Sequence, residues 1–166
     1  MSKRTNNLTL KALLIAMCIV GANFKVLGSI ALDSFPAFLG AIILGPVSGA
    51  VIGFFGHMVS AALSGFALTL PIHLIIATLM AACMFSYGWI RCNWKEGTLT
   101  SVIVSLLVAY IINVPLDLLL LYPMIGKAVY GLFVPLTIGT VANLFLTEIV
   151  YVMLPKKFKQ LMTTHN

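Results

Sequence analysis

The stretch Lys25–Pro36, KVLGSIALDSFP, decides how this chain is organised. It places a lysine, an aspartate and a serine between two long apolar runs. A break of this kind is typical of an integral membrane protein, in which polar loops join apolar helices. We therefore expect Lys25–Pro36 to be a solute-facing loop, and the rest of the chain can be placed relative to it.

The composition is that of a membrane protein. The 166 residues are 61% hydrophobic and 8% charged, with a mean hydropathy of +1.09. Soluble domains use roughly 45–50% apolar and 25% charged residues. Because a span needs about 20 residues, the length predicts about six spans in a single domain, residues 1–166, with no room for a soluble domain.

We predict an all-α bundle of six transmembrane helices. Gly45 and Pro46 turn the chain after the second span, and Pro71 suits the first turn of the fourth. The second and third spans share too few residues for two full crossings, so at least one is short or tilted. The predicted spans are 8–26, 35–44, 47–63, 71–89, 98–120 and 131–154.

The basic residues set the orientation. With six spans, both termini share one side, and that side holds eight lysines and arginines, whereas the other side holds Lys25 and Lys127. The eight are Lys3, Arg4, Lys11, Arg91, Lys95, Lys156, Lys157 and Lys159. The positive-inside rule then makes both termini cytoplasmic. Because the charge of +6 sits at helix ends, we expect no nucleic-acid partner.

No catalytic pattern is present in the sequence. The chain has no GxSxG, no HExxH and no GK[ST] after its glycines. Its cysteines, Cys18, Cys83 and Cys92, have no CxxC spacing and no neighbouring metal-ligand cluster. We therefore expect no enzyme activity, no metal site and no cofactor.

Small residues recur on the first and third spans. Ala12 and Ala16 lie four residues apart, a spacing that lets helix backbones approach closely. Two interpretations stay open for them: packing within this chain, or docking to another membrane subunit. The glycines of the third span, Gly49, Gly53 and Gly56, predict packing within the bundle.

Polar residues gather on the predicted outer side. Ionisable groups at membrane depth are costly unless they pair or line a cavity, so they are candidates for function. Together they would suit a small ligand with a flat ring and hydroxyl groups. The candidate ligand-binding residues are Asp33, Ser34, Thr69, His73, Asn113, Asp117, Tyr130 and Asn143.

Each of these candidates has a plainer alternative. Lys25 and Lys127 can reach toward the membrane surface as anchors, and the tyrosines can form an interfacial aromatic belt. Asn143 could either reach the cavity or only tie helices together. His57, inside the third span, is expected to bond a neighbouring helix.

These features resemble a known family. ALLIA (Ala12–Ala16), DSFPAFLGAIILGP (Asp33–Pro46) and GAVIGFFGH (Gly49–His57), in a six-span chain, resemble the substrate-binding S component of energy-coupling factor (ECF) vitamin transporters. The resemblance covers nearly the whole chain. It implies a bacterial cell-membrane protein that binds its vitamin outside and releases it inside.

The resemblance also implies partners and a substrate. Ala12 and Ala16 would contact a transmembrane T component that two cytoplasmic ATPases drive. SIALDSFPAFLG and SGFALTLPIHL are most similar to the branch assigned to alpha-ribazole, a benzimidazole riboside used for cobalamin. Riboflavin, pantothenate or a pyridoxine-like compound stay open, as does a structural or assembly subunit that binds no solute.

Overall fold

A computed structural model of the chain describes residues 3–23, 25–26 and 30–155. These residues are almost entirely helical, which confirms the all-α prediction apart from one short strand pair. The elements are α1 (Lys3–Asn23), β1 (Lys25–Val26), β2 (Ile30–Ala31), α2 (Phe35–Ile43), α3 (Pro46–Leu63), α4 (Leu70–Asn93), α5 (Leu99–Ile111), the π-helix η1 (Ile112–Leu116), α6 (Asp117–Ile125), the 3₁₀ helix η2 (Gly126–Leu132) and α7 (Phe133–Met153).

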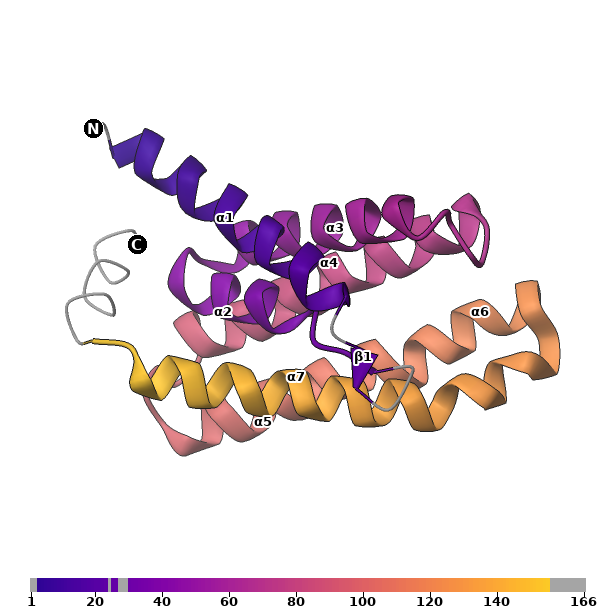
Figure 1. Ribbon diagram of the computed structural model, residues 1–166. Coiled ribbons are helices and arrows are strands. Elements are labelled where there is room, and N and C mark those ends of the chain that lie inside the picture. Colours follow the sequence, from indigo (N-terminus) through magenta and orange to yellow (C-terminus); the bar gives the residue numbers. More distant parts are fainter. Residues whose placement is uncertain (1–2, 24, 27–29, 156–166) are drawn as a thin grey trace.

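The helices form one elongated bundle (Figure 1). α3 and α4 run antiparallel on one side, while α5 and α6 form an arm that returns as η2 and α7 on the other. α1 crosses obliquely and ends near the middle of the bundle, where β1 and β2 pair antiparallel with Lys25 opposite Ala31. The start of α1 and the end of α7 lie at the same end of the bundle (Figure 1).

The short helix α2 lies at the centre of the fold. Seven of its nine residues, 36–42, are buried, and it contacts α1, α3, α4 and α7. Its sequence gives it sharp limits, because Pro36 suits a first helical turn and Gly45, at φ 88°, turns the chain into α3. Within the core, the ring of Phe38 packs edge-on against that of Tyr87, with centroids 5.0 Å apart.

The short span predicted at residues 35–44 is α2, and the predicted count of six spans is not confirmed. Nine residues of α-helix are about 14 Å long, roughly half of a hydrocarbon core of about 30 Å. In the described part of the chain, four helical runs are long and apolar enough to cross a membrane: Thr5–Asn23, Pro46–Leu63, Leu70–Asn93 and Leu99–Met153. The last run folds back on itself near Gly126 (Figure 1).

Glycines bring α2, α3 and α4 close together. A Cβ atom added at Gly49 would run into Ala41, and one added at Gly88 would lie 2.8 Å from the carbonyl oxygen of Ala41. At Gly53 an added Cβ would lie 2.9 Å from Cγ of Met84. The prediction that the third-span glycines pack within the bundle is confirmed at these positions.

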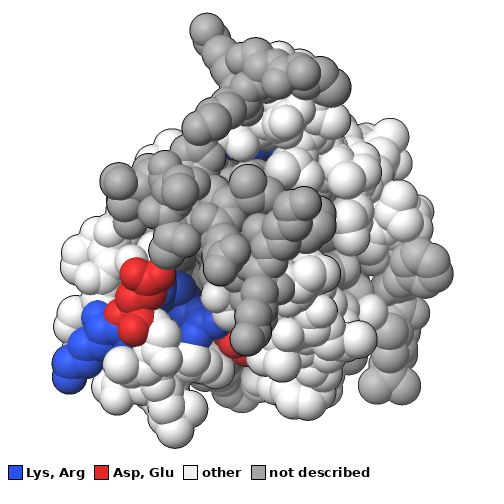
Figure 2. Space-filling model, turned by 90° about the vertical axis from the view of Figure 1, so that its left-hand side faces the viewer, with Lys and Arg blue, Asp and Glu red and all other residues white. Residues whose placement is uncertain are grey.

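Charged residues gather at the end where α4 ends and α5 begins (Figure 2). There Arg91 Nη2 lies 3.0 Å from Glu148 Oε2, and the Tyr87 hydroxyl donates to Glu148 Oε1 at 2.6 Å. The Arg91 guanidinium also lies 5.3 Å from the centre of the Tyr151 ring. These contacts join α4 to α7, so Glu148 has a structural role at this end.

The connection between α6 and α7 is more regular than expected. The predicted spans 98–120 and 131–154 leave a loop between them, but α6 continues to Ile125 and η2 follows directly. Pro123 falls inside α6, and the turn comes at Gly126, which has φ 57°. A positive φ is easiest for glycine, so the turn lies at this residue.

Candidate functional site

A line of polar side chains runs along one face of α7. Its members are spaced three, three and four residues apart, which places them on one side of a helix. Three of them are almost fully buried: Thr140 is 3% exposed, Asn143 2% and Thr147 0%. We call the line Thr137, Thr140, Asn143 and Thr147 the polar seam.

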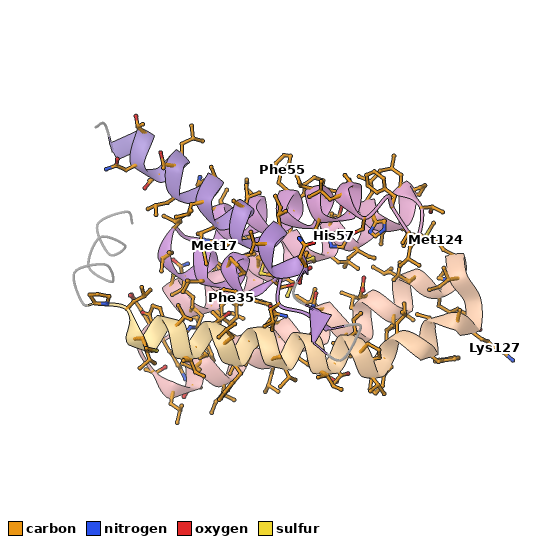
Figure 3. All side chains as sticks on the ribbon, in the orientation of Figure 1. Met17, Phe35, Phe55, His57, Met124 and Lys127 are labelled. Carbon is orange, nitrogen blue, oxygen red and sulfur yellow. The ribbon has the colours of Figure 1, made fainter. Side chains whose placement is uncertain are left out.

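Asn143 joins the seam to the start of α2. Its Oδ1 accepts hydrogen bonds from the backbone N–H groups of Ser34 (3.1 Å) and Phe35 (2.8 Å). The first N–H groups of a helix have no partner within it, so a buried helix start needs such an acceptor. Asn143 Nδ2 donates to the carbonyl of Gly139 at 2.8 Å. Figure 3 shows Phe35 between α2 and α7.

Asp33 and Ser34 precede α2 and lie outside the four apolar runs. The Ser34 hydroxyl donates to Asp33 Oδ1 at 3.0 Å. Burial raises the pKa of Asp33 above its ordinary value of 3.8, and the hydrogen bond from Ser34 partly offsets that rise. Through Ser34, Asn143 of the seam is linked to a carboxyl group in the segment that the sequence marked as the solute-facing loop.

The π-helix η1 brings Asn113 to the same seam. Pro115 lies inside it and has no N–H group, so the regular α-helical pattern cannot continue through this turn. A π turn relieves that conflict, and such turns are frequent at functional sites. Asn113 Nδ2 donates to Thr140 Oγ1 at 2.8 Å, and the hydroxyls of Tyr110 and Thr137 lie 3.3 Å apart.

Asp117 follows one helical turn after Asn113. It is the first residue of α6 and is 5% exposed. Its Oδ1 is buried and has no hydrogen-bond partner among the described residues. A buried polar atom without a partner is expensive, because burial removes the hydrogen bonds that water supplied. Asp117 is thus a site that a ligand group could complete.

A second polar group lies at the start of α4. Nδ1 of His73 lies 3.2 Å from Nε2 of His57, while the N–H of Leu68 points at Nε2 of His73 at 3.5 Å. The amide needs an acceptor there, so Nδ1 carries the proton and donates to His57. This arrangement is a hydrogen-bonded clamp, and among the described residues no group of three metal-binding side chains occurs.

The clamp holds a strained loop. In the segment between α3 and α4, Phe66 has φ 49° and Thr69 has φ 83°, values that non-glycine residues rarely adopt. The Phe66 ring packs near that of His73, with centroids 5.7 Å apart. Thr69 itself is exposed at the beginning of α4. Strain of this kind persists only where the surroundings enforce it, and here His73 supplies the contacts.

Tyr130 lies apart from the polar seam. It is 67% exposed, and its nearest described aromatic partner is Tyr122, with ring centroids 6.2 Å apart. Lys127 projects away from the bundle at the tip between α6 and α7 (Figure 3). The structure thus brings Asp33, Ser34, Asn113 and Asn143 together, with Asp117 one turn away, while Thr69 and His73 form a separate group and Tyr130 lies on the surface.

Ala12 and Ala16 are exposed on α1. Packing inside this chain therefore does not account for their spacing. Nearby exposed side chains on the same helix are apolar, with Leu13 55% and Val20 57% exposed. This surface faces either lipid or another membrane protein.

A comparison with family models decides the class of protein. The model of the ECF transporter substrate-specific component matches residues 6–162, nearly the whole chain. The chain belongs to this family. An ECF substrate-specific component is a membrane transport subunit that takes a small-molecule substrate and acts with T and ATPase partners, not an enzyme. Neither a curated protein nor a solved structure matches this S component.

Several members of the site escaped sequence reasoning. Thr137, Thr140 and Thr147 are isolated threonines in an apolar span, and threonines commonly bond their own helix there. Thr147 does so, donating to the carbonyl of Asn143 at 2.8 Å. The signal that could have found them is their common face with Asn143 on α7.

Proposed function

We propose that this S component captures alpha-ribazole, or a closely similar aromatic riboside, from outside the cell. It hands the solute inward together with a transmembrane T component and two ATPases. Both termini are cytoplasmic in this proposal, and the membrane is the bacterial plasma membrane. Ala12 and Ala16 form the T-component docking surface.

One observation supports the binding role most strongly. Asp117 is buried with an unpartnered oxygen, one turn from an asparagine that already bonds the seam. A subunit with only a structural role has no use for such a group, because an apolar side chain at this position would avoid the free-energy cost of a buried, unpaired carboxyl oxygen. A ligand-binding subunit has a use for it, since the ligand supplies the absent hydrogen bond.

The chemistry of the seam suits a riboside. Hydroxyls of the sugar can donate to Asp117 and can both donate to and accept from the side-chain amides of Asn113 and Asn143. The ring system needs an apolar surface, and the buried cluster of Ile72, Leu121 and Val129, whose Leu121 lies one turn after Asp117, would supply it. His57, His73 and Thr69 form a separate group at the start of α4, so the proposed ligand site is limited to the seam and Asp117.

A second candidate function is capture of another vitamin, such as riboflavin, pantothenate or a pyridoxine-like compound. These compounds also combine a ring or short chain with hydroxyl groups. A third is a structural or assembly subunit that binds no solute. The unpartnered oxygen of Asp117 favours the binding subunits over the third.

Equilibrium binding of a labelled aromatic riboside to the purified protein tests the proposal. Asp117→Ala is expected to weaken binding by at least about tenfold, the effect of losing a hydrogen bond to a charged group. Lys127→Ala is the matched control, because Lys127 is exposed and points away from the bundle. Equal losses from both variants would contradict the site.

A thermal-shift screen separates the candidate functions. A ligand that binds the native state raises the apparent melting temperature. The proposal predicts a shift with the riboside that exceeds those with riboflavin, pantothenate and pyridoxine. A larger shift with another vitamin would reassign the substrate, and no shift across the panel would favour the structural subunit.

A further inference from the structure

The four acidic residues of the chain have different surroundings. Glu148 is paired with Arg91 and also accepts the Tyr87 hydroxyl. Asp33 accepts the hydroxyl of Ser34, and Glu96 is exposed at the end of the bundle. Asp117 alone among them has a buried oxygen without a partner in the described structure.

Asp117 takes part in no salt bridge among the described residues. In the described structure the ion pair of Arg91 with Glu148 lies at the opposite end of the bundle from the tip that carries Lys127. Lys127 itself extends into the surroundings (Figure 3). The neighbours that Asp117 has along its own turn, Asn113 and Leu121, carry no charge. Among the described side chains, no cation is therefore within ion-pair distance of this carboxyl group.

We propose that Asp117 is the specificity-determining residue of the site: its Oδ1 accepts a hydrogen bond from an O–H or N–H group of the substrate and excludes anionic substrates. This inference rests on the proposed binding function and adds a substrate class to it. The class is a neutral or cationic, donor-bearing solute, such as a free riboside. Phosphate esters and carboxylates of the same solute are rejected.

The physical basis is that a buried carboxyl group without a partner attracts a hydrogen-bond donor and repels an anion. A donor on the ligand removes the cost of the unpaired buried oxygen and gains a strong hydrogen bond. An anionic group brought to the same place meets like charge in a medium of low polarity, where repulsion is little screened. The oxygen is closed off from solvent in this structure, so a ligand reaches it only after the groups that cover it rearrange.

Matched ligand pairs test the inference on the purified full-length protein. The probes are alpha-ribazole with its 5′-phosphate, riboflavin with its 5′-phosphate, pyridoxine with its 5′-phosphate, and pantothenate as a carboxylate. Affinities are measured for the native protein and for Asp117→Asn, which keeps the size of the side chain but removes its charge. Glu96→Gln is the control, because it removes the same charge from an exposed position.

The native protein is expected to bind one phosphate-free compound at least about tenfold more tightly than its phosphate ester. Asp117→Asn should shrink that ratio at least about fivefold, and Glu96→Gln should leave it unchanged. If Asp117→Asn keeps the native ratio, the inference is overturned while the binding function stands. Tightest binding of pantothenate or of a phosphate ester also overturns it. Failure of every compound to bind would overturn the binding function and the inference with it.

Discussion

Asn143 shows how one buried amide can shape a site. It satisfies the first two N–H groups that α2 leaves open, and it does so from a position inside α7. The same residue therefore fixes where α2 begins and where Ser34 and Asp33 stand. Of the two interpretations left open by the sequence, the described contacts establish that Asn143 ties helices together, and a ligand contact stays part of the proposal.

Asn143→Ala is expected to destabilise the protein by about 1–3 kcal/mol, because two buried backbone donors lose their acceptor. The apparent melting temperature in detergent should fall by several degrees. Thr78→Ala is the matched control, since the Thr78 hydroxyl bonds only the carbonyl of Leu74 on its own exposed helix face. A melting temperature for Asn143→Ala equal to that of the control would show that the tie contributes little.

At the residue scale, the sequence identified the polar residues but not their pairings. Asp33, Ser34, Asn113, Asp117 and Asn143 stand out because polar groups in apolar spans are costly. Which of them meet depends on the rotation of each helix about its axis, and the π turn at Pro115 changes that rotation locally. Tyr130 was grouped with them because it is close in predicted depth, yet its side chain is exposed.

At the scale of elements, α2 is the unusual feature. An apolar segment ending in Gly45 and Pro46 is as compatible with a short buried helix as with a span, because burial in protein and burial in lipid select the same residues. The deciding fact is tertiary: α2 is surrounded by four other helices. The sequence therefore predicted the helix, its shortness and its end, but not that other helices surround it.

The exposed face of α1 gives a prediction about assembly. Ala12→Leu places a bulky side chain on the proposed docking surface, where small residues allow close helix contact. Co-purification of the T component should be lost, while riboside affinity of the isolated protein stays unchanged. Ala82→Leu is the matched control, since Ala82 is an exposed alanine on α4. Normal co-purification of Ala12→Leu would remove the docking role.

At the scale of the whole molecule, the two ends of the bundle differ in the basic residues that they carry. Arg91 and Lys95 lie at the end of the bundle where α7 finishes, and Lys127 lies at the opposite tip. The start of α1 and the end of α7 lie at the same end of the bundle even though α2 is short, because α2 still reverses the direction of the chain. Counting the basic residues could predict this arrangement, because the count depends only on which successive turns of the chain lie at the same end.

Cysteine labelling in intact cells tests the proposed orientation. Lys127→Cys should react with a membrane-impermeant maleimide from outside, whereas Glu96→Cys should react only after the cells are made permeable. The native protein supplies the background, because Cys18 and Cys83 are buried and Cys92 is partly buried. The reverse pattern would place the polar seam toward the cytoplasm and exclude capture from outside.

The central claim is that this S component holds a small solute through Asp117 and the polar seam. Mass spectrometry of small molecules released from the purified protein tests it most directly, with cells grown on a mixture of vitamins and ribosides. The account predicts a neutral aromatic riboside released in near-equal amount to the native protein and lost from Asp117→Ala. Release of the same compound in the same amount from both proteins, or of no compound from the native protein, would contradict it.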